Sequence, residues 1–199
     1  MARMRAEARR RQLLEVSADL FAQHGYRGTT TAELAKAAEV TEPILYRHFK
    51  NKLDLFVTLV DEVGREVLDA WRESLSGVDE PAQRLEILLA GNPATHERGK
   101  GVYRVIFQAM TEIGRDPDIA KPLRRHLTRL HGFLCEELEH LQKRGHVRDD
   151  EPAGALAWML IDIAIGYGMS SPLGLPGQGT ANGRSSMQTL LVEMLTKRG

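Results

Sequence analysis

The sequence has very little cysteine, no excess charge and no long hydrophobic run. Its single cysteine, Cys135, excludes an internal disulfide framework and a zinc site built from cysteines, and it favours a cytoplasmic protein. The 27 basic residues equal the 27 acidic residues, so net charge does not indicate a partner. No signal peptide is expected, because arginines fill the start without a following apolar stretch. Residues 155–169 are apolar, but they contain Asp162 and are too few for a membrane span.

Charge is distributed unevenly along this neutral chain. Residues 1–52 contain ten Lys and Arg against six Asp and Glu, so the remainder carries the negative excess. A basic amino-terminal segment is typical of a surface that binds a polyanion. Its first arginines fit a flexible arm that enters a DNA minor groove, or alternatively a solvated run of charge. These arginines are Arg3, Arg5, Arg9, Arg10 and Arg11.

Apolar residues recur at three- and four-residue spacing almost everywhere, which predicts an all-α protein. The first helix is expected over Glu7–His24, with Gly25 as a left-handed stop. Asp150 is expected to cap a later helix that has Pro152 in its first turn. The other helices are expected over residues 30–38, 41–49, 51–75, 81–91, 102–113 and 118–144, and after a Pro/Gly-rich loop at 171–183.

Two short helices with a tight turn between them are expected after the first helix. Thr30 and Glu33 have the spacing of a capping box, in which the hydroxyl and the carboxylate each satisfy one free amide. Thr41 is a second good N-cap, and Pro43 stands in a first turn, where its missing N–H does no harm. Ala35 is small enough for a close crossing of helices. This arrangement is a helix-turn-helix, whose second helix enters the major groove of DNA.

The segment from Gly25 to Leu53 resembles the DNA-binding signature of the TetR family of transcriptional regulators. It reads Gly-Tyr-Arg-Gly-Thr-Thr-Thr-Ala-Glu-Leu-Ala from residue 25 and Ala-Glu-Val-Thr-Glu-Pro-Ile-Leu-Tyr-Arg-His-Phe-Lys-Asn-Lys-Leu from residue 38. The resemblance implies a TetR-like all-α fold: a helix-turn-helix domain at residues 1–54, and a helical ligand-binding and dimerisation domain at residues 55–199. It implies a homodimer on a palindromic DNA operator, a repressor that a small-molecule effector releases. It implies no enzymatic activity, no cofactor and no metal.

The DNA contacts follow from side-chain chemistry and from this resemblance. Tyr46 and Lys52 match the family's phosphate contacts, because a phenol and an ammonium hold backbone oxygens without reading sequence. Pro43 and Ile44 suit a thymine methyl group, and Glu42 suits the amino group of cytosine. The full set expected at the DNA is Thr30, Thr41, Glu42, Pro43, Ile44, Tyr46, Arg47, His48 and Lys52.

Several of these residues have a simpler interpretation that stays open. Thr30 and Thr41 serve equally well as helix caps alone. Glu42 serves as a charge that complements the helix dipole. His48 either touches phosphate or lies exposed. One residue departs from the family pattern: Glu39 fills a turn position usually held by glycine, and a positive φ there destabilises glutamate by about 1 kcal/mol relative to glycine.

The carboxyl-terminal half is expected to dimerise and to sense an effector. A segment that is apolar on nearly every side, and a last helix with a Met/Leu stripe, suit the family's dimer contact; an ordinary core helix is the alternative. The interface residues expected are Ile165, Met187, Leu191 and Met194. The effector pocket is expected among Tyr103, Phe107, Met110, His131, Trp158, Asp162 and Tyr167, and core packing is the alternative for each. Asp162 in particular is a carboxylate amid apolar neighbours, and it needs a partner from its own core, the other subunit or a cationic ligand.

Two other functions stay in view. Glu137 and His140 have the three-residue spacing of di-iron ligands in helical bundles, although the sequence contains no second copy of the motif. A helical-bundle metal enzyme is therefore one alternative, and a solvated helix face is the simpler interpretation of both residues. The other alternative is a DNA-binding protein without a small-molecule ligand.

Overall fold

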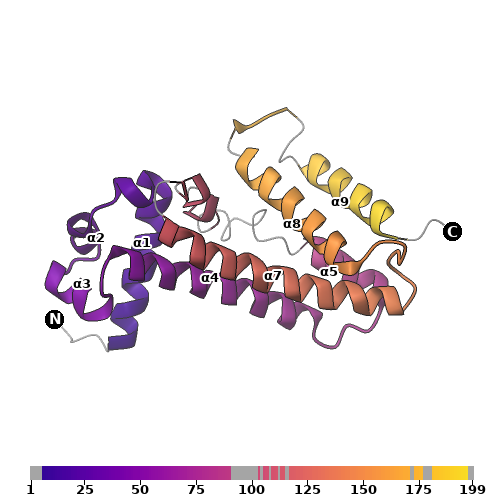
Figure 1. Cartoon of the computed structure of the whole chain (residues 1–199), viewed down its shortest axis with the longest axis horizontal. Helices are drawn as coiled ribbons and strands as arrows, with labels where there is room; N and C mark the ends of the chain where they lie inside the picture. Colours follow the sequence, from indigo (N-terminus) through magenta and orange to yellow (C-terminus); the bar gives the residue numbers. More distant parts are fainter. Residues whose placement is uncertain are drawn as a thin grey trace. The chain divides into compact units, whose positions relative to one another are not determined.

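The computed structural model describes residues 6–90, 103, 105–107, 109–111, 113–114, 117–170, 173–176 and 181–196, and only the backbone of 181–185. These residues form helices and no strand, as the sequence predicts (Figure 1). The helices are α1 (Ala6–Gly28), α2 (Thr31–Ala37), α3 (Glu42–His48), α4 (Lys52–Leu75), α5 (Pro81–Ala90), α7 (Pro117–Lys143), α8 (Ala153–Ser170) and α9 (Ala181–Leu195). The described residues between 103 and 111 are also helical.

The chain divides into two compact units. The first comprises Met1–Val63 and Gly101–His126, and the second comprises Gly64–Lys100 and Leu127–Gly199. Helices α4 and α7 each contribute one part to either unit, since the division falls inside both of them. The functional boundary expected at residues 54 and 55 stays a prediction.

Aromatic packing holds the first unit together. The rings of Phe21 and Tyr26 lie 5.8 Å and 5.0 Å from that of Phe56, which comes from α4. Gly25 interrupts α1 with φ 76° and ψ 166°, a conformation that a β-carbon would oppose. The kink turns Tyr26 back toward Phe21, 5.8 Å away, so the glycine expected to stop the helix also helps to form this core.

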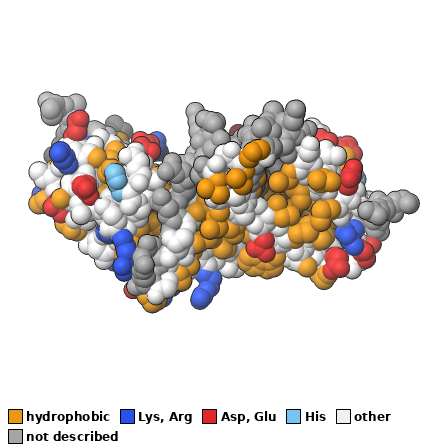
Figure 2. All heavy atoms as spheres, turned by 90° about the horizontal axis from the view of Figure 1, so that it is seen from above, with side chains coloured by type: hydrophobic (Ala, Val, Ile, Leu, Met, Phe, Trp, Pro, Cys, Tyr) orange, Lys and Arg blue, Asp and Glu red, His pale blue; other side chains and the backbone are white. Residues whose placement is uncertain are grey.

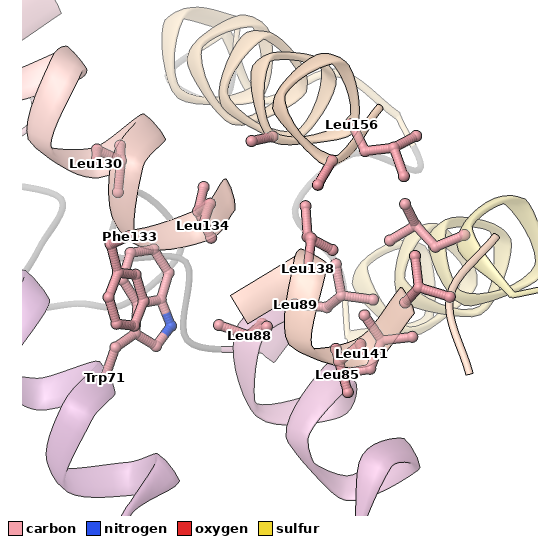
Figure 3. Close-up of a cluster of buried hydrophobic side chains, with 14 of the residues drawn as sticks. Trp71, Leu85, Leu88, Leu89, Leu130, Phe133, Leu134, Leu138, Leu141 and Leu156 are labelled. Carbon is pink, nitrogen blue, oxygen red and sulfur yellow. The ribbon is translucent and has the colours of Figure 1, made fainter. Parts of the chain in front are cut away.

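Leucine packing fills the second unit. Leucines recur along α7 at three- and four-residue steps, and this stripe lies inside, where Leu134, Leu138 and Leu141 are buried. Figure 3 shows them facing leucines of α5 and α8 across one continuous cluster. The end of α9 joins this unit through an isolated antiparallel bridge between Val147 and Thr196.

Two expectations for α8 were wrong. Asp150 does not cap the helix: its carboxylate pairs with Arg148 at 2.6 Å, and the carbonyl of Pro152 accepts the first helical hydrogen bonds. The apolar segment is also longer than expected. Helix α8 has 18 residues, and by its length and composition alone it could cross a membrane. Its residues Leu156 and Ile161 are buried in the core of the second unit, and 33% of the segment is buried in all.

Candidate nucleic-acid interface

The predicted capping box begins α2. The Thr30 amide donates to the Glu33 carboxylate at 2.7 Å, and the Glu33 amide donates to the Thr30 hydroxyl oxygen at 3.2 Å. The hydroxyl also donates to the same carboxylate at 2.8 Å. These bonds, first the one from the Thr30 backbone and then the one from its side chain, lower the pKa of Glu33. Capping is therefore the observed role of Thr30, and its DNA contact stays a prediction.

The capping box makes stability depend on pH. Because the folded-state pKa of Glu33 is lowered, its contribution to stability is present above the unfolded-state value near 4.5 and is lost as pH falls through the folded value. We expect the melting temperature of Glu33→Gln to approach that of the wild type as pH falls below about 4.5, and to lie below it at pH 7. Melting curves at several pH values measure the difference. A difference that is the same at every pH would contradict the assignment.

The turn after α2 carries a glutamate in a left-handed conformation. Glu39 has φ 54°, and it is the single non-glycine residue with positive φ among those that the structure describes. Backbone bonds close the turn on either side, from the Val40 amide to the Ala35 carbonyl at 2.9 Å and from the Glu39 amide to the Lys36 carbonyl at 3.1 Å. The departure from glycine in the sequence therefore leaves a strained residue inside an otherwise intact turn.

Replacing Glu39 by glycine is expected to stabilise the protein by about 1 kcal/mol, because glycine adopts positive φ without a steric penalty. Thermal melting should show a rise of about 2–4 °C for a chain of this size. Glu39→Ala is the matched control: it removes the carboxylate but keeps the β-carbon, so it should not give this gain. A melting temperature lower in Glu39→Gly than in the wild type would contradict the strain argument.

Helix α3 presents a polar face to solvent over an apolar underside. Leu45 and Phe49 are buried, each 2% exposed. Thr41, Pro43 and Arg47 are exposed, and Tyr46 is 47% exposed; Ile44 and His48 are half-buried. Thr41 occupies the N-cap position, yet its hydroxyl makes no capping hydrogen bond. Its interpretation as a cap through the side chain was therefore wrong.

A hydroxyl network holds this face in position. The Thr31 hydroxyl donates to the Glu42 carboxylate at 2.8 Å, and the Tyr46 hydroxyl donates to the Thr31 oxygen at 3.3 Å. Thr31 thus orients two of the predicted DNA contacts from the neighbouring helix α2. Sequence reasoning missed Thr31, although its position in the Thr-Thr-Thr run at 29–31 places it next to the predicted cap.

Lys52 joins the start of α4 to the end of α1. Its ammonium donates to the carbonyls of Tyr26 and Thr29 at 2.9 Å and 3.0 Å and lies 4.6 Å from the centre of the Tyr26 ring. The Asp54 amide donates to the Asn51 side chain at 2.8 Å, so Asn51 caps the start of α4. A structural role of Lys52 is therefore observed, and its phosphate contact stays a prediction.

The basic arm differs from the expectation. Arg9, Arg10 and Arg11 belong to α1, whereas Arg3 and Arg5 lie outside the described residues. The Arg10 guanidinium donates to the His48 carbonyl at 2.9 Å and lies 4.4 Å above the Phe49 ring centre. Arg10 therefore supports the carboxyl end of α3 instead of belonging to a flexible arm. No short-range pattern predicts this, because its partners are 38 and 39 residues away.

The predicted dimer surface is an apolar face on α8 and α9. Figure 2 shows hydrophobic side chains gathered on this side of the second unit. Met187 and Met194 are 37% and 51% exposed, whereas Ile165 and Leu191 are partly buried against the core. The same two helices carry three further exposed apolar side chains: Trp158, Met169 and Leu190. Large exposed apolar areas of this kind are typical of protein contacts.

The predicted pocket residues are divided between the two units. Tyr103, Phe107 and Met110 belong to the first unit, where burial raises the pKa of Tyr103 and its hydroxyl lies 3.3 Å from His126. The other four belong to the second unit: His131, Trp158, Asp162 and Tyr167.

Within the second unit, these four residues differ in their surroundings. His131 hydrogen-bonds the Gly154 carbonyl at 3.0 Å and stacks on the exposed Trp158. Tyr167 is buried. Asp162 is exposed on α8, and its partner, whether from its own core, the other subunit or a cationic ligand, stays a prediction.

The candidate metal ligands are engaged otherwise. The Glu137 carboxylate accepts two hydrogen bonds from Arg84, at 2.7 Å and 3.2 Å, and both side chains are largely buried. The interpretation of Glu137 as part of a solvated face was therefore wrong. Among the described residues, no three His, Cys, Asp or Glu lie in an arrangement that holds a metal.

Comparisons with known proteins agree with this geometry. The family model of "Bacterial regulatory proteins, tetR family" matches residues 13–59. The transcriptional regulator UidR of Escherichia coli is 22% identical over 81% of this chain and 80% of its own length. The nucleoid occlusion factor SlmA of Aliivibrio fischeri is 32% identical over 53% of this chain and 55% of its own.

Solved structures share the whole fold. A regulator from Saccharomonospora viridis in complex with choline superposes with a TM-score of 0.85 over 98% of this chain and all of its own, at 22% identity. Salmonella enterica GusR superposes with a TM-score of 0.79 over 96% of this chain and 97% of its own, at 21% identity. These likenesses concern the fold, and the helix-turn-helix lies inside the segment that the family model covers.

Proposed function

This chain belongs to the TetR family of DNA-binding transcriptional regulators, and from that premise we propose that it is a repressor released from its operator by a small molecule. Family members bind DNA as dimers and are generally not enzymes. We infer a palindromic operator, which two copies of α3 read from one side. We also assign the protein to the cytoplasm, where its DNA is.

One observation carries the proposal: α3 is a short, exposed helix whose polar residues are held in position from below. Leu45 and Phe49 anchor it in the core, while Thr31 orients Glu42 and Tyr46. A preorganised polar face on a rigid helix suits the edges of bases, since its side chains need little ordering on binding. Glu42, a pure acceptor, is expected to contact a base amino group, because nearby phosphates would repel it.

The proposal of a dimer follows from the small number of base pairs that one recognition helix contacts. A single recognition helix reads few base pairs, so specific sites need two copies about one helical turn apart, or a multiple of that spacing. The apolar face of α8 and α9, with Met187 and Met194 exposed on it, supplies a contact that a second copy would bury. Release requires an effector that binds the DNA-incompetent state better, with a coupling of typically about 1–3 kcal/mol.

Selection of bound fragments from random DNA tests the proposal. We expect a palindromic motif with half-sites one or two helical turns apart. Arg47→Glu is the control: this exposed residue on α3 should tolerate the change without unfolding, yet the variant should enrich no motif. Enrichment of no sequence, or of an unpaired half-site, by the wild-type protein would refute the proposal.

A further inference from the structure

The indole nitrogen of Trp71 is buried without a hydrogen-bond partner. Trp71 is 6% exposed, and no acceptor reaches its Nε1–H among the described residues. An indole N–H is a donor only, so no rearrangement of the proton relieves it. Buried polar groups are almost always paired, and each exception needs an explanation.

The described side chains that pack with Trp71 in the core of the second unit are apolar. Its ring stacks on Phe133 at 5.6 Å between centres with 16° between planes, inside the cluster of buried leucines. Figure 3 shows the nitrogen on the ring edge that faces Leu88. These side chains contain no acceptor, so the described residues leave the donor unsatisfied in an apolar setting. A single polar donor among apolar side chains is the combination that small-molecule sites use to orient a ligand.

The nearby cations are already engaged. Arg84 donates to Glu137 and to the carbonyls of Leu75 and Val78. Arg72 lies 5.8 Å from the Phe133 ring centre, but its side chain is 61% exposed and pairs with Asp69. An anionic ligand at Trp71 would therefore lack a buried counter-charge among the described residues, and burying an unpaired ion is strongly unfavourable.

We propose that Trp71 Nε1–H is the hydrogen-bond donor of the effector site, and that the effector is a neutral, largely apolar molecule with an oxygen acceptor. A carbonyl or ether oxygen would satisfy the indole, while the rest of the molecule would pack against Phe133 and the leucines. This inference rests on the proposed function in that it names the ligand class of the regulatory unit. An analogue without the acceptor should bind about tenfold more weakly, since it leaves the donor unpaired.

The chain offers a direct spectroscopic test, because it contains two tryptophans. In Trp158→Phe, which removes the partly exposed one, a single indole N–H signal reports Trp71. This protein is titrated with 4-phenylbutan-2-one, with butylbenzene, which lacks the carbonyl, and with 3-phenylpropanoate, which carries a charge. We expect the ketone to move the indole proton signal downfield and to bind about tenfold more tightly than butylbenzene, and the carboxylate to bind most weakly.

A second variant tests the donor itself. Adding Trp71→Phe should make the ketone and butylbenzene bind equally, as measured by calorimetry. If this double variant does not fold, the affinities of the ketone and butylbenzene for Trp158→Phe still test whether Trp71 is the donor. Equal affinity of the two neutral probes there, tightest binding of the carboxylate, or a Trp71 signal that no neutral probe moves would overturn the inference.

The outcome separates this inference from the proposed function. DNA selection uses the protein without any probe. A protein that selects a palindrome, but whose Trp71 signal ignores every probe, refutes the ligand class alone. A protein that binds the ketone through Trp71, yet selects no DNA motif, refutes the regulator alone.

Discussion

Met194→Glu is expected to produce monomers and to weaken operator binding by about a hundredfold or more. In a dimer, binding of one α3 helix to its half-site holds the second α3 helix near the other half-site, and a monomer lacks this high effective concentration. Met194 is 51% exposed on the apolar face of α9, so a charge there is solvated in the monomer but would be buried unpaired in a dimer. Leu191 and Ile165 are predicted interface residues too, but both pack partly against the core. A charge at either of them would disturb folding as well as association.

Sedimentation velocity measures the oligomeric state, and titration of a two-half-site operator measures affinity. Met194→Leu is the matched control: it keeps an apolar side chain of similar volume and should sediment and bind as the wild type does. The melting temperature of Met194→Glu should be compared at a concentration where the wild type is also monomeric. If Met194→Glu sediments as a dimer, the face formed by α8 and α9 is not the dimer contact.

Operator affinity is expected to fall about a thousandfold between 50 and 200 mM salt, because phosphate neutralisation releases condensed counterions. Arg47, Lys50 and Lys52 place about three cations near the α3 face of each protomer, so a dimer neutralises about six phosphates and the logarithmic slope is about −5. Arg47→Gln removes one cation per protomer and should make the slope less steep by about 2. Affinities measured at several salt concentrations give this slope.

Lys121→Gln is the matched control for the salt series. Lys121 is an exposed cation that pairs with Asp118 on α7, away from α3 in sequence, so its loss should leave the slope unchanged. An equal change of slope in Arg47→Gln and Lys121→Gln would mean that net charge, and not contact through α3, sets the salt dependence. A wild-type slope near zero would exclude phosphate contacts as the main source of affinity.

The helix-turn-helix was predictable because its signals are local. The capping box of Thr30 and Glu33, the cap of α4 by Asn51 and the left-handed turn at Glu39 each involve residues no more than five positions apart. Short spacings of this kind are set by helix geometry and backbone sterics, which the order of residues specifies directly. The leucine stripe of α7 was predictable for the same reason, since helical periodicity marks the face that must be buried.

The exposure of particular side chains was not predictable in this way. Asp162 stands among apolar residues in the sequence, yet it lies on the exposed side of α8. Asp150 has the position of a helix cap, yet it pairs with Arg148. A helix that is apolar on nearly every side can bury any of those sides. The side that faces the core therefore depends on the helices that pack against it.

The sequence alone determined the all-helical architecture, the recognition helix α3 and the helix caps by Thr30 and Asn51, because each arises from contacts within one or two helical turns. Folding in three dimensions was needed to move Arg10 onto Phe49, to bring Thr31 to Glu42, and to leave Trp71 Nε1 unpaired beside Phe133. Those contacts join different helices, and their distances depend on how whole helices pack, which no local pattern encodes.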